Sequence, residues 1–191
     1  MLLYIHGFNS SPASFKANAL KNALTRLGRG NEFLCPALPH RPQQAMALLE
    51  AILPHQDLDV VTIVGSSLGG FYATYLTEKY AVQTVLINPA IYPHDGLHTY
   101  LGPQKNLYSG EEYTLTEQHL EDLRALYVPT LKHLDRYLLI TATGDEVLDY
   151  REGVARYAGA EQIIIHGSDH GLSDFADYLD KILIYAGILS L

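Results

Sequence analysis

Six short apolar runs, separated by longer stretches with helical spacing, set the strongest limit on how this chain can fold. The runs cover residues 2–7, 32–38, 59–65, 82–88, 136–144 and 161–167. They are continuous instead of alternating with polar residues, which is typical of strands buried on both faces of a parallel sheet. Helices are expected at about 12–28, 41–55, 67–80 and 148–159, with a last helix from about Ser173. The pattern predicts an α/β fold with a mostly parallel sheet.

Residues 90–135 break this rhythm and separate two runs that should form neighbouring strands. The segment is rich in Tyr, Gly, Pro, His and acidic residues, and it holds no convincing strand. A helix is expected over 116–126, capped by Thr114 or Thr116. We interpret the segment as a cap-like insertion within one domain, residues 1–191, because long excursions are often lids or binding loops. The alternative is a surface insertion with a role in an interface.

The stretch "IVGSSLGGFYA", residues 63–73, ends one of these runs and opens a helical pattern. Gly65-x-Ser67-x-Gly69 matches the nucleophile elbow, in which a strained turn exposes a serine hydroxyl at the carboxyl end of a sheet. Small residues are needed two positions before and after the serine, because strand and helix approach closely there. Ser66 does not fit, since the positions two before and two after it are not glycine. Ser67 is therefore the candidate nucleophile.

Two phosphate-binding interpretations of the same turn are weaker. A P-loop requires a lysine before its last Ser or Thr, and this loop contains no lysine. A dinucleotide-binding fold requires an acidic residue after the next strand, which here ends in "VLINPA".

A serine hydroxyl needs a histidine to take its proton, and that histidine needs an orienting acid. Where a nucleophile elbow carries the serine, the three residues follow one another in the chain as serine, acid and histidine. Asp145 directly follows the run at 136–144 and is the candidate acid. Glu146 and Asp149 are the rival carboxylates. A helix N-cap at Asp145 or Asp149 is the alternative interpretation of the same stretch.

His170 lies in the loop between the last strand and the last helix, where the general base is expected. His166 is expected to end the strand itself. The pair His166-x3-His170 could suggest a metal site, but that spacing needs a continuous helix and a Gly-Ser break lies between them. No metal is expected.

The segment "HGFNSSP" follows the first run and supplies the remaining part of a hydrolytic site. Its position predicts that the backbone N–H of Phe8 forms an oxyanion hole with the N–H of Leu68. The same segment also fits an ordinary loop into a helix capped by Ser10 or Ser11. Both interpretations can hold together.

With these motifs in place, the sequence resembles the α/β-hydrolase superfamily, and more narrowly the small bacterial YqiA-type esterases. The matching stretches are "LLYIHGFNSSP", "IVGSSLGGFYATYL", "VLINPA", "TGDEVLDYR" and "GSDHG". The resemblance implies a serine hydrolase for acyl esters, with Ser67 as nucleophile, Asp145 as acid, His170 as base and no cofactor. The superfamily usually begins with two antiparallel strands that this chain lacks. We therefore expect a reduced sheet of about six strands, with helices on both faces and a small cap insertion.

Charge and composition restrict the partners. The formal net charge is −8 and no basic run is present, which disfavours nucleic acid or an anionic membrane. The single cysteine, Cys35, allows no internal disulfide, and no apolar segment approaches membrane length. We therefore expect a soluble, cytoplasmic protein acting on a small acyl ester. The alternatives are an acyl-CoA thioesterase with the same triad, or a binding protein that kept the fold and lost catalysis; the oligomeric state stays open.

Overall fold

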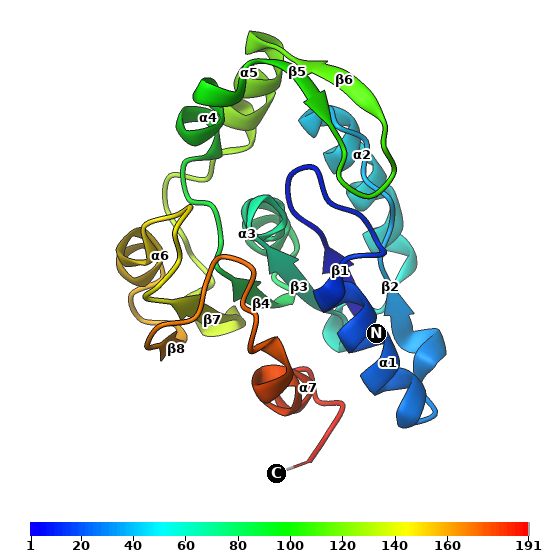
Figure 1. Cartoon of the computed structure of the whole chain (residues 1–191). Helices are drawn as coiled ribbons and strands as arrows, with labels where there is room; N and C mark the ends of the chain where they lie inside the picture. Colours follow the sequence, from blue (N-terminus) through cyan, green and yellow to red (C-terminus); the bar gives the residue numbers. More distant parts are fainter. Residues whose placement is uncertain (191) are drawn as a thin grey trace.

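A computed structural model describes residues 1–190 and contains the expected parallel sheet (Figure 1). Its six strands are β1 (Leu2–Ile5), β2 (Phe33–Leu34), β3 (Thr62–Ser66), β4 (Gln83–Ile87), β7 (Tyr137–Ala142) and β8 (Glu161–Ile165). They lie in the order β2-β1-β3-β4-β7-β8, and every neighbouring pair is parallel. The predicted α/β class with about six mostly parallel strands is confirmed.

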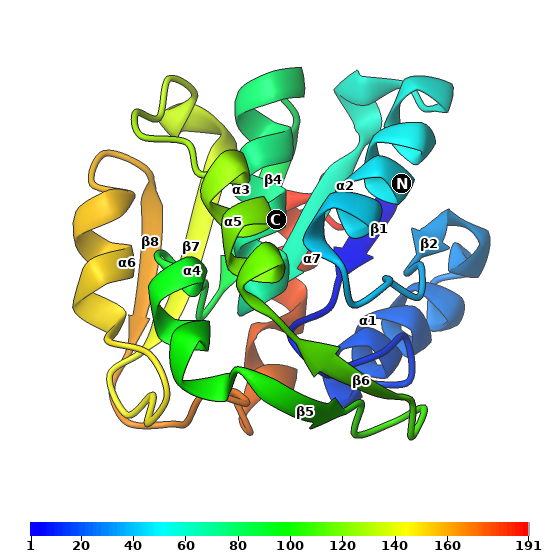
Figure 2. The ribbon, with the colours of Figure 1, turned by 90° about the horizontal axis from the view of Figure 1, so that it is seen from above.

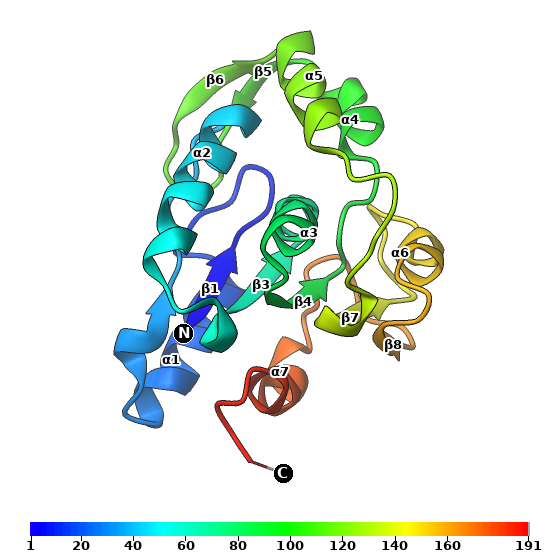
Figure 3. The ribbon, with the colours of Figure 1, turned by 180° about the vertical axis from the view of Figure 1, so that it is seen from behind.

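Five helices cover the two faces of the sheet. They are α1 (Phe15–Arg26), α2 (Pro42–Ile52), α3 (Leu68–Tyr80), α6 (Tyr150–Arg156) and α7 (Leu179–Tyr185). Helices α1 and α7 cover one face, and α2, α3 and α6 cover the other (Figures 1 and 3). The N-cap of α1 is Ser14, and not Ser10 or Ser11.

The strand side chains alternate between two apolar cores, which explains why the runs are continuously apolar. In β1, Leu3 and Ile5 join the core beneath α2 and α3, whereas Leu2 and Tyr4 join the core beneath α1 and α7. All four side chains are at most 1% exposed. Because both faces are covered, no position in this strand can be polar without a buried partner.

Strand β2 is shorter than the run at 32–38 predicts, since only Phe33–Leu34 pairs with β1. Pro36 offers no N–H to continue the ladder. The N–H of Leu38 instead donates to the ring Nε2 of His6 at 3.2 Å, so the chain leaves the sheet edge. Burial lowers the pKa of His6, which keeps this ring nitrogen free to accept.

The segment between β4 and β7 extends across the carboxyl ends of the strands (Figure 2). It contains α4 (Pro93–Gly96), β5 (Gly102–Lys105), β6 (Glu112–Leu115) and α5 (Glu117–Leu126). The helix expected over 116–126 is confirmed, with Thr116 as its N-cap. The expectation of no strand was wrong, because β5 and β6 form an antiparallel hairpin. Strand β5 consists of Gly, Pro, Gln and Lys, which have low β-propensity, and β6 has only four residues, so the pair is a weak strand signal in the sequence.

None of the helices within residues 1–190 combines the length and the apolar character that crossing a membrane requires.

Candidate active site

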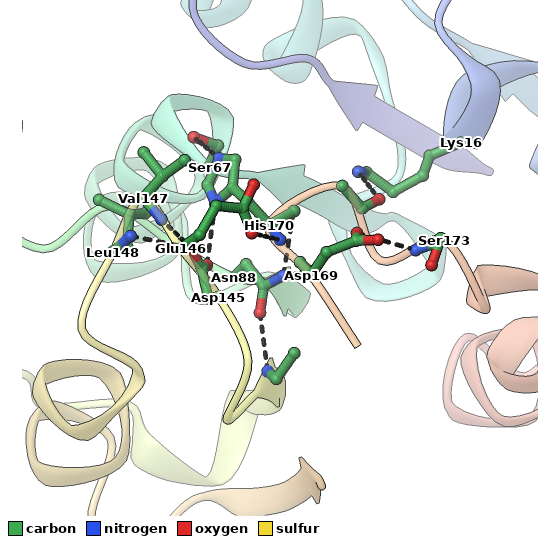
Figure 4. Close-up of polar contacts among 12 residues, drawn as sticks. Lys16, Ser67, Asn88, Asp145, Glu146, Val147, Leu148, Asp169, His170 and Ser173 are labelled. Atoms are coloured by element: carbon green, nitrogen blue, oxygen red, sulfur yellow. Dashed lines mark hydrogen bonds and ion pairs between the residues drawn. The ribbon is translucent and has the colours of Figure 1, made fainter. Parts of the chain in front are cut away.

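Ser67 lies at the turn between β3 and α3, with φ 54° and ψ −120°. This left-handed backbone conformation is unfavourable for any residue with a side chain and is found where the surroundings impose it. The turn places the hydroxyl at the carboxyl edge of the sheet, as the nucleophile elbow requires (Figure 4).

The glycines two positions either side of Ser67 are required by close backbone contacts. A Cβ at Gly65 would lie 2.5 Å from the carbonyl oxygen of Gly69 and 2.8 Å from the Cβ of Ala73. A Cβ at Gly69 would overlap the carbonyl oxygen of Ile5 and lie 2.6 Å from its carbonyl carbon. The helix therefore packs directly on β3 and β1, and only hydrogen atoms fit between them.

Ser67, His170 and Asp145 form one continuous chain of hydrogen bonds (Figure 4). The Nε2 atom of His170 lies 3.1 Å from the Ser67 Oγ, and its Nδ1 lies 2.8 Å from the Asp145 Oδ2. A carboxylate only accepts, so Nδ1 carries the proton and Nε2 is free to accept from the serine. This is the geometry of a nucleophile, a base and an orienting acid.

The Asp145 carboxyl is buried, with 1% of its side chain exposed. Burial raises the pKa of this carboxyl. The hydrogen bonds from His170 and from the backbone N–H groups of Leu148 and Val147 lower the pKa by more than burial raises it, so the net pKa is below its ordinary value. These two N–H groups lie 2.8 and 2.9 Å from Oδ1. Asp145 therefore stays ionised.

The rival carboxylates have other partners. Asp149 caps α6, where it accepts from the Arg151 N–H and pairs with its guanidinium at 2.7 Å. Glu146 accepts the backbone N–H of His170 at 2.9 Å, so it contacts the base without contacting the ring. His166 is exposed directly after β8. Within residues 1–190, Asp145 alone reaches the ring of His170 with a carboxylate.

The two predicted oxyanion donors lie beside Ser67, at the mouth of the same cleft. Leu68 is the first residue of α3, so its N–H has no acceptor within the helix. Phe8 follows Gly7, where a Cβ would lie 3.2 Å from the Cβ of Ser67. Within residues 1–190, neither N–H donates to a protein acceptor. Both donors are available to an oxygen bound next to the serine.

Asn88 holds the loop that carries His170. It directly follows β4, is 1% exposed and has φ 40°. Its Nδ2 donates to the carbonyls of Asp169 and His170, both at 3.1 Å, and its Oδ1 accepts the Ala142 N–H at 2.9 Å. Asn88 lies in the stretch "VLINPA", which by itself assigns this residue no role; the signal that could have found it is a polar residue directly after a buried strand.

A cleft of about 630 Å³ opens above Ser67 and His170. The cap side of the cleft contains Ile91, Tyr92, Leu97 and Tyr100, and the loop before α6 adds Val147 and Leu148. The charged residues on its wall are Asp95, Asp149 and Glu152, and none of its described lining residues is Lys or Arg. In the described part of the chain, no three His, Cys, Asp or Glu side chains come together as metal ligands.

This parallel sheet, with a strained serine between β3 and α3, is the arrangement of the α/β-hydrolase fold. The chain belongs to the family described as "Uncharacterised protein family (UPF0227)", whose model matches residues 1–187. A UPF0227 protein of Pectobacterium carotovorum subsp. carotovorum (strain PC1) is 23% identical over 187 residues, 95% of this chain and 96% of the relative.

Two solved structures show the same fold. The alpha/beta hydrolase domain-containing protein 10 from mouse superposes with a TM-score of 0.72 at 14% identity, covering 95% of this chain and 88% of its own. The esterase domain from a Rhodothermus marinus protein superposes with a TM-score of 0.61 at 19% identity, covering 95% and 83%. The expected fold, that of the α/β hydrolases, is thereby confirmed.

Proposed function

We propose that this protein hydrolyses acyl esters through an acyl-enzyme formed on Ser67. The observation that carries the proposal is the continuous chain from the Ser67 Oγ through His170 to the buried Asp145. At its serine end this chain of hydrogen bonds reaches a cleft that is also lined by Phe8 and Leu68. Within residues 1–190, the backbone N–H groups of these two residues donate to no protein acceptor. A strained serine with a base within reach is costly to maintain unless the hydroxyl is used.

In the first half-reaction, His170 takes the Ser67 proton while the Oγ attacks the acyl carbonyl. The carbonyl oxygen becomes an oxyanion, to which the N–H groups of Phe8 and Leu68 donate. The bond to the alcohol oxygen then breaks, and His170 gives its proton to the leaving alcohol. In the second half-reaction, His170 takes a proton from water as the water oxygen attacks the acyl carbon. The bond between this carbon and the Ser67 Oγ then breaks, His170 returns the proton to Oγ, and the carboxylic acid leaves. Asp145 remains ionised throughout and stabilises the imidazolium.

The substrate class follows from the charge of the cleft. Its wall bears the carboxylates of Asp95 and Glu152, whereas the charge of Asp149 is paired with Arg151, and none of the lining residues is Lys or Arg, so a polyanionic group is repelled there. CoA carries several phosphate charges and would have to lie across this mouth. The lining therefore favours an uncharged acyl ester over an acyl-CoA thioester. The apolar and tyrosine residues of the cap provide contacts for the acyl chain.

Turnover of p-nitrophenyl esters of graded acyl length tests the activity. Ser67→Ala should lose activity by about 10⁶-fold, the loss seen when a nucleophile that acts with its triad is removed. Ser66→Ala is the matched control, because this neighbouring serine is 5% exposed at the end of β3 and takes no part in the chain to Asp145. Turnover by Ser67→Ala close to that of the unmodified protein would refute the proposal.

Two thioesters test whether the carboxylates of the cleft disfavour a charged leaving group. The same acyl group is offered on CoA and on N-acetylcysteamine, so that the two thioesters differ in charge and size of the leaving group but not in the reacting bond. We expect the uncharged thioester to have the higher kcat/KM, with the difference narrowing as salt screens the carboxylates. A higher kcat/KM for the CoA thioester at low salt would reverse the assignment of substrate class.

A further inference from the structure

The segment that supplies one oxyanion donor has little structure of its own. Residues 8–10, here called the oxyanion loop, follow β1 and precede α1 without forming helix or strand. Asn9 has φ 50°, a conformation that needs support from its surroundings. The position of the Phe8 N–H therefore depends on what holds its neighbour.

The hairpin β5–β6 holds the side chain of Asn9 at both ends. The Asn9 Nδ2 donates to the Gln104 Oε1 at 3.1 Å, and the Tyr113 hydroxyl donates to the Asn9 Oδ1 at 2.8 Å. Gln104 and Tyr113 are directly paired across the two strands. One cross-strand pair thus fixes both the donor and the acceptor of the amide.

The loop between the two strands holds the backbone of the same segment. The N–H of Leu107 donates to the carbonyl of Asn9 at 3.2 Å, and the Asn106 Nδ2 donates to the carbonyl of Ser10 at 2.9 Å. Figure 3 shows the chain after β1 reaching up to the hairpin. Four hydrogen bonds therefore join the hairpin to two consecutive residues, Asn9 and Ser10.

Tyr113 is itself fixed from the other side. Its ring stacks on His40 with centroids 4.4 Å apart, and the Nδ1 of His40 lies 3.0 Å from the Nε2 of His119 in α5. His119 is 3% exposed, and its Nδ1 accepts the N–H of Thr116 at 3.2 Å. Burial raises the pKa of Tyr113 to about 12, so its hydroxyl keeps the proton it donates to Asn9. The hairpin is thus anchored to the body of the protein.

We propose that the β5–β6 hairpin positions the oxyanion hole, with Tyr113 and Gln104 acting through Asn9 to hold the N–H of Phe8. The proposal rests on the proposed function, because it assigns this N–H to the oxyanion. It gives the hairpin a role other than that of a cover over the cleft. An oxyanion donor acts mainly in the transition state, so a misplaced Phe8 N–H should lower kcat and leave ground-state binding unchanged.

The decisive variant is Tyr113→Phe, which removes one hydroxyl and keeps the ring that stacks on His40. Tyr108→Phe is the matched control, since Tyr108 lies in the same hairpin loop, is 50% exposed and has no hydrogen bond to its hydroxyl among residues 1–190. We expect Tyr113→Phe to lower kcat about 10-fold, a part of the 10²–10³ that a lost donor costs, with KM within about twofold. Binding of phenylboronic acid, whose serine adduct is tetrahedral, should weaken by the same factor as kcat.

A merely structural hairpin would give a different result. Tyr113→Phe would then lower the melting temperature while kcat and the affinity for phenylboronic acid stayed at the values of Tyr108→Phe. That outcome would overturn the proposal. Asn9→Gly tests it again, because glycine accepts the positive φ and removes both side-chain hydrogen bonds; it should behave like Tyr113→Phe.

The backbone amide spectrum separates this inference from the proposed function. In Tyr113→Phe, the NMR resonance of the Phe8 N–H should shift, whereas that of Leu68, which is held by α3, should not. If the unmodified protein hydrolyses no ester, the proposed function fails while the Phe8 shift still decides whether the hairpin holds this N–H. An unmoved Phe8 resonance would refute the positioning role whatever the activity.

Discussion

Replacing Gly69 by alanine tests whether the elbow depends on direct contact between α3 and β1. The added Cβ would overlap the Ile5 carbonyl oxygen, and it would lie 2.6 Å from the Ile5 carbonyl carbon and 2.8 Å from the His6 oxygen. Ordinary carbon–carbon contact needs about 3.5 Å, so the contact with the Ile5 carbonyl carbon alone requires helix and strand to separate by at least about 0.9 Å, and the closer carbonyl oxygen requires more. All the obstructing atoms are backbone, which cannot rotate away.

This separation would move Ser67 relative to the Phe8 N–H, because Ser67 lies at the turn that starts α3 whereas Phe8 lies in the loop after β1. A displacement near 1 Å can cost about 100-fold in rate, and overpacking a core costs about 1–3 kcal/mol in stability. We expect Gly69→Ala to lose about 100-fold in kcat/KM for p-nitrophenyl esters and to lower the free energy of unfolding in urea by about 1–3 kcal/mol.

Gly153→Ala is the matched control. Its Cβ would meet the Leu139 Cδ1 at 3.8 Å, an ordinary contact, within α6. A glycine inside a helix is about 0.5–1 kcal/mol less favourable than alanine, so this variant should be at least as stable as the unmodified protein and equally active. Equal activity and stability in Gly69→Ala would show that the helix does not need its close approach to β1.

Three further predictions follow from single residues of the site and the cap. Ser67→Gly should be about 1 kcal/mol more stable than Ser67→Ala in urea unfolding, because both lack the hydroxyl and only glycine relieves the φ of 54°; equal stabilities would argue against strain at the elbow. Asn88→Asp keeps the acceptor for the Ala142 N–H but loses both donors to the His170 loop, so labelling of Ser67 by a fluorophosphonate should slow about 10-fold; an unchanged labelling rate would remove this positioning role. Burial, the neighbouring His40 and the Arg41 charge lower the pKa of His119 below its ordinary 6.5, so the unfolded chain takes the proton first. The neutral His119 side chain therefore stabilises the folded protein above about pH 6.5, and this stabilisation is lost as pH falls through the folded pKa. The urea midpoint of the unmodified protein should fall more steeply below about pH 6.5 than that of His119→Gln; parallel pH profiles would contradict this.

The sheet and the elbow were predictable because their determinants are local. A strand buried on both faces, such as β3, must be continuously apolar, and this pattern is visible in a short window. The spacing Gly65-x-Ser67-x-Gly69 is visible in an equally short window, although only Gly65 is set by contacts within the strand–turn–helix unit, whereas Gly69 is set by the backbone of Ile5 and His6. Asp145 and His170 could be placed because each lies in the loop that follows a recognisable strand, and parallel strands end at one edge of the sheet.

The parts that the sequence did not reveal depend on partners distant in the chain. The hairpin is a weak strand signal, because its strands have four residues each, only Leu115 among them is buried, and Gln104 and Tyr113 are held by contacts with Asn9 and His40. A two-stranded hairpin is marginal alone, so its existence depends on these contacts. Asn88 is similar: its role comes from carbonyls about 80 residues away, at separations of 81 and 82. The end of β2 is set by His6, which no local pattern indicates.

The central claim is that Ser67 is an activated nucleophile with His170 as its base. Reaction of the whole protein with a fluorophosphonate, followed by mass spectrometry of the peptides, tests this without knowledge of the substrate. We expect the unmodified protein to form one adduct, on Ser67. The adduct should be absent in Ser67→Ala and in His170→Ala and present in Ser66→Ala. A protein that stays unlabelled, or one labelled equally in His170→Ala, would contradict it.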